Sequence, residues 1–127
     1  MSPIRVSICD DVHELRALIR FYVDAEADLE VVSESSNGVA ALRDVARAQP
    51  DVLVLDLSMP EMDGLEVLVR LPDVAPETRV VVLSGLTLDG VRAKASRLGA
   101  VRFVDKSLPM SALVDAVREV ADSLPRA

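Results

Sequence analysis

The run Val52-Leu53-Val54-Leu55, entered from Pro50-Asp51 and followed at once by Asp56, decides the fold of this chain. Four consecutive apolar residues without alternation are typical of a central strand that is covered on both faces of a parallel sheet. The turn-rich segment 58–64 comes next, and a short helical pattern then occupies residues 65–71. This run therefore predicts the centre of a parallel sheet.

Outward from this strand, short β-branched runs alternate with longer stretches of helical periodicity. The sequence predicts strands at residues 4–9, 29–33, 52–55, 79–83 and 101–104. It predicts helices near residues 12–23, 40–46, 65–71, 89–98 and 110–124. The first of these helices is expected to carry its apolar residues on one face, made of Val12, Leu15, Leu18, Ile19, Tyr22 and Val23. The alternation predicts an α/β fold, a doubly wound five-stranded parallel sheet with five helices and right-handed crossovers.

Length and composition limit the possible functions. The 127 residues, half of them hydrophobic, fit one domain over residues 1–127, with 125–127 as a tail or the stump of a linker. No apolar run approaches the roughly 20 residues of a membrane-spanning helix, and the N-terminus does not resemble a signal peptide. One cysteine, Cys9, fits a reducing compartment, so we expect a cytoplasmic protein with no membrane association. A net charge of −7 and 2% aromatic residues argue against direct nucleic-acid binding by this chain.

Polar side chains follow the strands at their carboxyl ends, where open parallel sheets bind ligands. Asp10-Asp11 follows the first strand, Asp56 the third, and Asp105-Lys106 the fifth, while Ser84 ends the fourth. Three carboxylates so close together repel one another unless a cation neutralises them. A hard divalent cation, Mg²⁺ or Mn²⁺, answers this need, because Mg²⁺ binds through one or two carboxylates with waters and phosphate oxygens. Asp56 could then act as a nucleophile toward a phosphoryl group, with Lys106 screening the charge.

Simpler explanations exist for each of these polar residues. An aspartate such as Asp56 commonly caps a turn after its strand. Asp10-Asp11 could cap the first helix, and we expect Asp11 to do so in addition. Lys106 could lie on the surface, and a serine such as Ser84 that ends a strand is ordinary. The convergence of all of them at one edge favours the functional interpretation.

Four nearby residues are expected to have no chemical role. His13, the only histidine, is expected at the surface or the rim of the site, because it has no companion ligands. Cys9 lies in an apolar strand and is expected to be an inert core thiol. Packing explains Met59 and Met62.

The stretch from Asp56 to Gly64 carries the motif Asp-x-x-Met-Pro-x-Met-Asp-Gly. With Asp10-Asp11, Ser84-Gly85 and Lys106 in the same order and spacing, the chain resembles bacterial receiver domains of two-component response regulators over essentially its whole length. The resemblance implies a flavodoxin-like receiver fold and a phosphoryl group accepted from a sensor histidine kinase. It is closer, weakly, to receivers of transcription factors that carry helix-turn-helix output domains.

The resemblance also implies a role for each residue of the site. Asp56 would accept the phosphoryl group; Asp11, Asp56 and the backbone carbonyl of Ser58 would bind Mg²⁺, and Asp10 would act through a water. Lys106 would pair with the phosphoryl oxygens. The Ser84 hydroxyl would move toward the phosphoryl group and Phe103 into the space that it leaves, although a core aromatic explains Phe103 almost as well. The surface of the fourth helix, fifth strand and fifth helix would then change as a two-state shift.

Two positions are expected to tune the lifetime of the acyl phosphate, and one feature departs from the family. Ser58, two residues after Asp56, and Leu86, two after Ser84, match the tuning positions of receivers. Many receivers have a cis proline directly after the lysine, whereas Ser107 follows Lys106 here. A cis bond at that place would cost roughly 2.5–4 kcal/mol.

Two other functional classes compete with the phosphoacceptor switch. A nucleotide-binding or phosphatase enzyme on this fold would need a glycine-rich turn after the first strand, or a second acid two residues after Asp56; the chain has Asp10-Asp11 and Ser58 there. A phosphorylation-independent docking module is the other alternative. The expected partners are a histidine kinase, an output domain or effector protein, and a second copy in a phosphorylation-dependent homodimer. The only catalysis expected is self-phosphorylation from small donors and self-dephosphorylation.

Overall fold

The computed structural model describes residues 2–59, 62–85 and 89–122. In chain order the elements are β1 (Ile4–Cys9), α1 (His13–Asp24), β2 (Leu29–Ser35), α2 (Gly38–Ala48), β3 (Val52–Leu55), α3 (Gly64–Val74), β4 (Arg79–Ser84), α4 (Asp89–Arg97), β5 (Ala100–Asp105) and α5 (Met110–Asp122). All the predicted strands and helices are present, and β1 and β3 have the predicted bounds. The predicted end of the last helix at Leu124 and the tail 125–127 lie outside the described residues.

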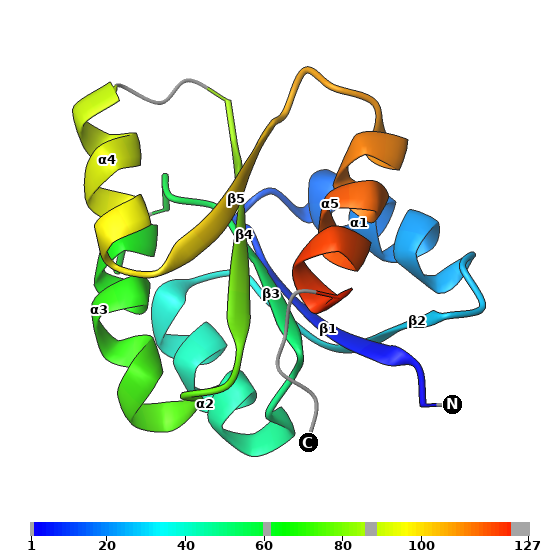
Figure 1. The fold of residues 1–127 in the computed structure, drawn as a ribbon, viewed down its shortest axis with the longest axis horizontal. Helices are drawn as coiled ribbons and strands as arrows, with labels where there is room; N and C mark the ends of the chain where they lie inside the picture. The colour runs from blue at the N-terminus through cyan, green and yellow to red at the C-terminus, as the bar shows by residue number, and fades with distance from the viewer. Residues whose placement is uncertain (1, 60–61, 86–88, 123–127) are drawn as a thin grey trace.

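The five strands form one sheet in the order β2-β1-β3-β4-β5, and every neighbouring pair is parallel. The order reverses direction between β1 and β3, because the chain adds β2 on one side of β1 and all later strands on the other side. Figure 1 shows α1 and α5 on one face of the sheet and α2, α3 and α4 on the other. The predicted doubly wound α/β fold is confirmed.

The core consists of two apolar clusters, one on each face of the sheet, and β3 contributes to both. Val52 and Val54 pack into the cluster with α1 and α5, and Leu53 and Leu55 into the cluster on the other face. All four side chains are at most 1% exposed. Burying a side chain of this size contributes about 1.5–3 kcal/mol, which explains why this run determines the centre of the sheet.

The apolar face predicted for α1 is buried only in part. Ile19 and Val23 of α1 are fully buried, but Val12, Leu18 and Tyr22 are 44%, 44% and 43% exposed. Successive residues differ by about 100° around a helix, so Leu18 and Tyr22 lie to one side of the stripe that touches the sheet.

Within the described part of the chain, no helix combines the length and apolar character that a membrane crossing requires.

Candidate functional site

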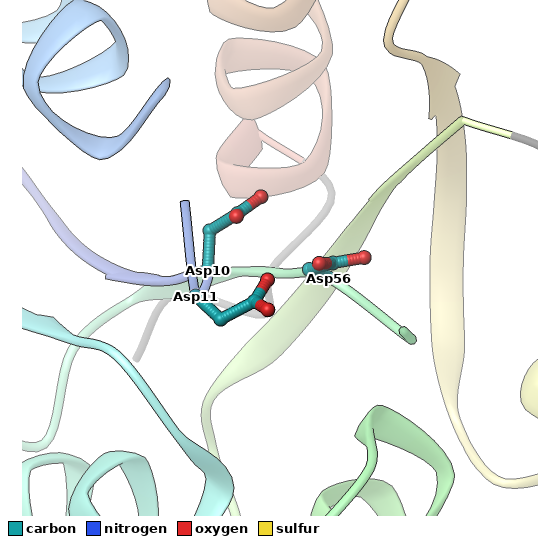
Figure 2. Close-up of side chains that lie close together, drawn as sticks. All are labelled: Asp10, Asp11 and Asp56. Atoms are coloured by element: carbon teal, nitrogen blue, oxygen red, sulfur yellow. The ribbon is translucent and has the colours of Figure 1, made fainter. Parts of the chain in front are cut away.

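The two central strands bring two aspartates together. β1 and β3 pair in parallel with Cys9 opposite Leu55, so the next residue of each strand, Asp10 and Asp56, emerge side by side. Asp10 is 1% exposed and Asp56 is 2% exposed, whereas Asp11 is exposed. One carboxylate oxygen from each of the three side chains lies within 4.8 Å of the others, and Figure 2 shows them gathered beside the strand ends.

Hydrogen bonds to the backbone fix one oxygen of each buried carboxylate. Asp10 Oδ1 accepts from the amide of Val12 at 2.8 Å, and Asp56 Oδ1 accepts from the amide of Ser58 at 3.0 Å. The simpler interpretation of Asp56 as a turn cap is therefore correct, but it uses only one oxygen. The other oxygens, Asp10 Oδ2 and Asp56 Oδ2, are buried and accept no well-aligned hydrogen bond.

Lys106 is the positively charged side chain that pairs with the buried aspartates. Its Nζ lies 3.2 Å from Asp10 Oδ2 and 3.4 Å from Asp56 Oδ2, and its side chain is 25% exposed. Burial raises the pKa of Asp56 above its usual range, and the negative charge of Asp10 adds to this, against the opposing effects of the Ser58 amide and Lys106. Burial alone would lower the pKa of Lys106, but the carboxylates of Asp56 and Asp10 outweigh it and raise that pKa. One ammonium group thus leaves the acidic cluster incompletely neutralised.

The donor set fits a hard divalent cation. Mg²⁺ prefers oxygen ligands, and Lys106 alone compensates only part of the desolvation cost of the two buried oxygens that lack aligned donors. Asp11 supplies a third, exposed carboxylate beside them. The backbone of Ser58, the remaining expected ligand, belongs to the turn that the Asp56 carboxylate caps.

Ser84 and Phe103 lie together on the next two strands. Lys106 donates its amide hydrogen to the carbonyl of Ser84 at 3.0 Å, which joins the end of β4 to the residue after β5. Phe103 is partly buried, and the guanidinium of Arg92 lies 4.7 Å from the centre of its ring. A pocket of about 270 Å³ is lined by both Ser84 and Phe103, together with Gly85, Arg92, Val104, Asp105 and Leu108.

The structure corrects one expectation about the β1–α1 connection. Asp11 does not cap α1: Val12 occupies the N-cap position without a side-chain hydrogen bond. The carboxylate of Asp10 instead receives the amide of Val12, since Asp10 is the residue turned inward at the strand end. His13 is exposed, with its Nδ1 3.4 Å from Arg16 Nη2, as expected for a residue at the rim.

Other expectations near the site are met, except for one that concerns a residue outside the described part of the chain. Cys9 is 1% exposed, and burial, with the charges of Asp10 and Asp56, raises the pKa of its thiol to about 12. Met59 is partly buried and packs with its Sδ 3.4 Å from Cys9 Sγ. The Lys106–Ser107 bond is trans, as are all peptide bonds of the described residues. Leu86 lies outside the described residues.

Sequence analysis did not single out Arg16, which lies on α1 close to the acidic cluster. Its Nη1 donates to the backbone carbonyl of Asp10 at 2.8 Å, and its side chain is only 14% exposed. An arginine in the first turn of a helix is ordinary in a sequence, and the one available signal was its position five residues after Asp11.

Known proteins resemble this chain over most of its length. The family model described as the response regulator receiver domain matches residues 6–118. The chain is 32% identical over 118 residues to the chemotaxis protein CheY of Listeria monocytogenes, with 93% of this chain and 98% of that protein covered. It is 39% identical over 127 residues to a protein-glutamate methylesterase/protein-glutamine glutaminase of Moorella thermoacetica, but it spans only 30% of the length of that protein.

Solved structures share the same fold. The signal receiver domain of the putative response regulator NarL from Mycobacterium tuberculosis superposes with a TM-score of 0.91 at 29% identity, over 97% of this chain and 99% of that one. The response regulator domain of Thermotoga maritima CheB superposes with a TM-score of 0.87 at 30% identity and the same coverage.

Proposed function

The chain belongs to the family of response regulator receiver domains, and on this premise we propose that Asp56 accepts a phosphoryl group from a sensor histidine kinase. The observation that carries the proposal is the arrangement around Asp56 Oδ2, a buried carboxylate oxygen without an aligned donor, 3.4 Å from Lys106 Nζ and beside Asp10. A free nucleophilic oxygen next to a fixed ammonium is what phosphoryl transfer to a carboxylate requires.

In the proposed reaction, a carboxylate oxygen of Asp56 attacks the phosphorus of a phosphohistidine. The new O–P bond forms as the N–P bond breaks, and the leaving imidazole keeps the electron pair of that bond and takes up a proton. Lys106 holds the phosphoryl oxygens by charge. A bound Mg²⁺ or Mn²⁺, held by Asp11, Asp56, the Ser58 carbonyl and, through water, Asp10, would supply further neutralisation of charge. Attack of water on the acyl phosphate later releases inorganic phosphate and restores the carboxylate.

The signal would leave the site through Ser84 and Phe103. Both residues line the pocket between α4 and β5, so a movement of the Ser84 hydroxyl toward a phosphoryl group would change the space next to the Phe103 ring. The α4–β5–α5 surface would then shift between two populations. In this role the chain is a switch, and its catalysis is limited to its own phosphorylation and dephosphorylation.

We propose partners of three kinds for this switch in the cytoplasm. A histidine kinase would supply the phosphoryl group, an output domain or effector protein would read the α4–β5–α5 surface, and a second copy could join in a phosphorylation-dependent homodimer. The structure of a DNA-binding response regulator of the LuxR family from Staphylococcus aureus, a structural neighbour at 25% identity, supports a DNA-binding output in a longer protein.

The test is incubation with acetyl phosphate, with and without Mg²⁺, followed by intact-mass measurement. The parent should gain one phosphoryl group only with the metal, Asp56→Asn should gain none, and Asp73→Asn, a change at an exposed aspartate of α3, should behave as the parent. If no variant gains mass, and Asp56→Asn binds its partners as the parent does, the chain is a docking module. If substitution of both Ser58 and Leu86 leaves the decay rate unchanged, these two residues do not tune the lifetime.

A further inference from the structure

Arg16 contacts the acidic site, although it is neither one of the three aspartates nor the lysine assigned to that site. Its Nη1 donates a 2.8 Å hydrogen bond to the backbone carbonyl of Asp10. Asp10 as a whole is 1% exposed, so this carbonyl lies inside the protein, where an unpaired backbone oxygen is costly. The guanidinium is therefore a structural partner of the peptide that joins Asp10 to Asp11.

The guanidinium is itself held in place from β2. Arg16 Nε lies 3.5 Å from Glu34 Oε1, and the other oxygen of Glu34 pairs with Arg20 Nη1 at 2.6 Å. Glu34 precedes Ser35, whose carbonyl accepts the amide hydrogen of Asp10 at 3.1 Å. The end of β2 thus holds Asp10 twice, directly at its N–H and through Arg16 at its C=O.

The Asp11 side chain depends on this backbone. Within the described part of the chain, the Asp11 carboxylate accepts no hydrogen bond and forms no ion pair, so only the orientation of its own backbone directs it toward Asp56. We propose that Arg16 is a positioning residue for the divalent cation: by fixing the Asp10–Asp11 peptide, it aims the Asp11 carboxylate at the place where the cation binds. This inference rests on the proposed function, since it assumes a cation at the cluster.

A different role for Arg16 would give the opposite result. As a mere nearby positive charge, the guanidinium would repel Mg²⁺, and its removal would strengthen cation binding. As a positioning residue it stabilises the ligand geometry, and its removal would weaken binding. Outer partners that orient metal ligands typically change metal affinity 10–100-fold when substituted. The sign of the change in affinity therefore separates the two roles.

The experiment is a Mg²⁺ titration of ¹⁵N-labelled protein at constant ionic strength, followed by the amide shifts of residues around Asp11 and Asp56, without any phosphodonor. Arg16→Met should raise the Kd for Mg²⁺ roughly tenfold. Arg16→Lys, which keeps the charge and one donor, should recover part of the affinity. Arg20→Met is the matched control, because it removes the same charge and a contact with Glu34 but no bond to Asp10; its Kd should stay within about twofold of the parent.

Each outcome decides the proposal. If Arg16→Met binds Mg²⁺ as tightly as the parent or more tightly, Arg16 is a bystander charge and the inference is wrong. If Arg16→Met does not fold, Glu34→Gln takes its place, because it loosens the same guanidinium, and an unchanged Kd there would also overturn the inference. If the parent itself binds no Mg²⁺, the metal-dependent proposed function fails together with this inference, whereas failure in the Arg16 variants alone leaves that function intact.

Discussion

The guanidinium of Arg92 lies 4.7 Å from the centre of the Phe103 ring, so α4 and β5 are joined at the pocket that Ser84 also lines. A cation–π contact at a partly exposed site contributes about 0.5–1 kcal/mol. Because Phe103 is the proposed moving aromatic, this contact should favour one position of its ring.

We therefore expect Arg92→Gln to mobilise the Phe103 ring and to lower the free energy of unfolding by about 0.5 kcal/mol. The chain has two phenylalanines, so fluorophenylalanine labelling gives two ¹⁹F signals, which Phe21→Leu assigns. The Phe103 signal should move or broaden in Arg92→Gln and stay unchanged in Lys94→Gln on the same helix. Equal effects of the two variants would show that the contact does not hold the ring.

Asp56→Asn should stabilise the metal-free protein at pH 7 by on the order of 1 kcal/mol, because it removes a buried charge that lacks an aligned donor. Burial raises the pKa of Asp56 in the fold, so the native state binds its proton more readily than the unfolded state does. The penalty is complete above the raised pKa and disappears as the pH falls toward the unfolded value near 3.9.

Urea unfolding at several pH values checks this prediction. The advantage of Asp56→Asn over the parent should shrink from pH 7 to pH 4, and added Mg²⁺ should reverse it by stabilising only the parent. Asp73→Asn should stay within about 0.5 kcal/mol of the parent throughout. An Asp56→Asn variant less stable than the metal-free parent at pH 7 would mean that the ion pair with Lys106 outweighs the burial of the charge.

Gly64→Ala should lower the free energy of unfolding by about 3 kcal/mol. A methyl group at Gly64 would lie 2.5 Å from Leu57 Cα and 2.6 Å from the carbonyl oxygen of Asp56, and neither backbone atom can easily move. Gly90→Ala in α4 is the control, since a methyl group there meets nothing within 4 Å, and it should stabilise by about 0.5 kcal/mol. Denaturant melts of both variants test the close packing of α3 against the strand end.

Cys9 should resist alkylation in the folded protein. With its pKa raised to about 12, the thiolate fraction at pH 8 is lower by roughly a thousandfold than that of a free thiol with a pKa near 8.5. Iodoacetamide labelling followed by mass spectrometry should therefore be slow without denaturant and rapid in guanidinium chloride. Fast labelling under native conditions would show that β1 opens readily.

Most of the fold could be predicted from the sequence because the central strands β3 and β4 bury apolar runs that few other structures would accommodate. Val52–Leu55 is the clearest case, with both faces covered. The face of α1 was harder to predict, because apolar residues surround more of that helix than the sheet can cover. Leu18 and Tyr22 fit the helical period as well as Ile19 and Val23 do, and only the packing of α1 against the sheet distinguishes them.

The acidic cluster could also be predicted, because parallel strands present their carboxyl ends at one edge of the sheet. The hydrogen-bond partners of individual atoms could not be predicted. The bond from Arg16 to the Asp10 carbonyl joins a side chain to a backbone oxygen, and no residue type marks the receiving end in a sequence. The use of Asp10 rather than Asp11 by the Val12 amide depends on which of two adjacent aspartates turns inward.

The strand order places the aspartates and the lysine of the site on strands that differ in how easily they open. Asp10 and Asp56 follow β1 and β3, each of which lies between two strands, whereas Lys106 follows β5, which has a neighbour on one side only. Edge strands can open in local fluctuations that leave the interior of a sheet intact. Fraying of β5 would withdraw the ammonium group and leave the aspartates in place, so the proposed switch would lose its lysine, and regain it, without global unfolding.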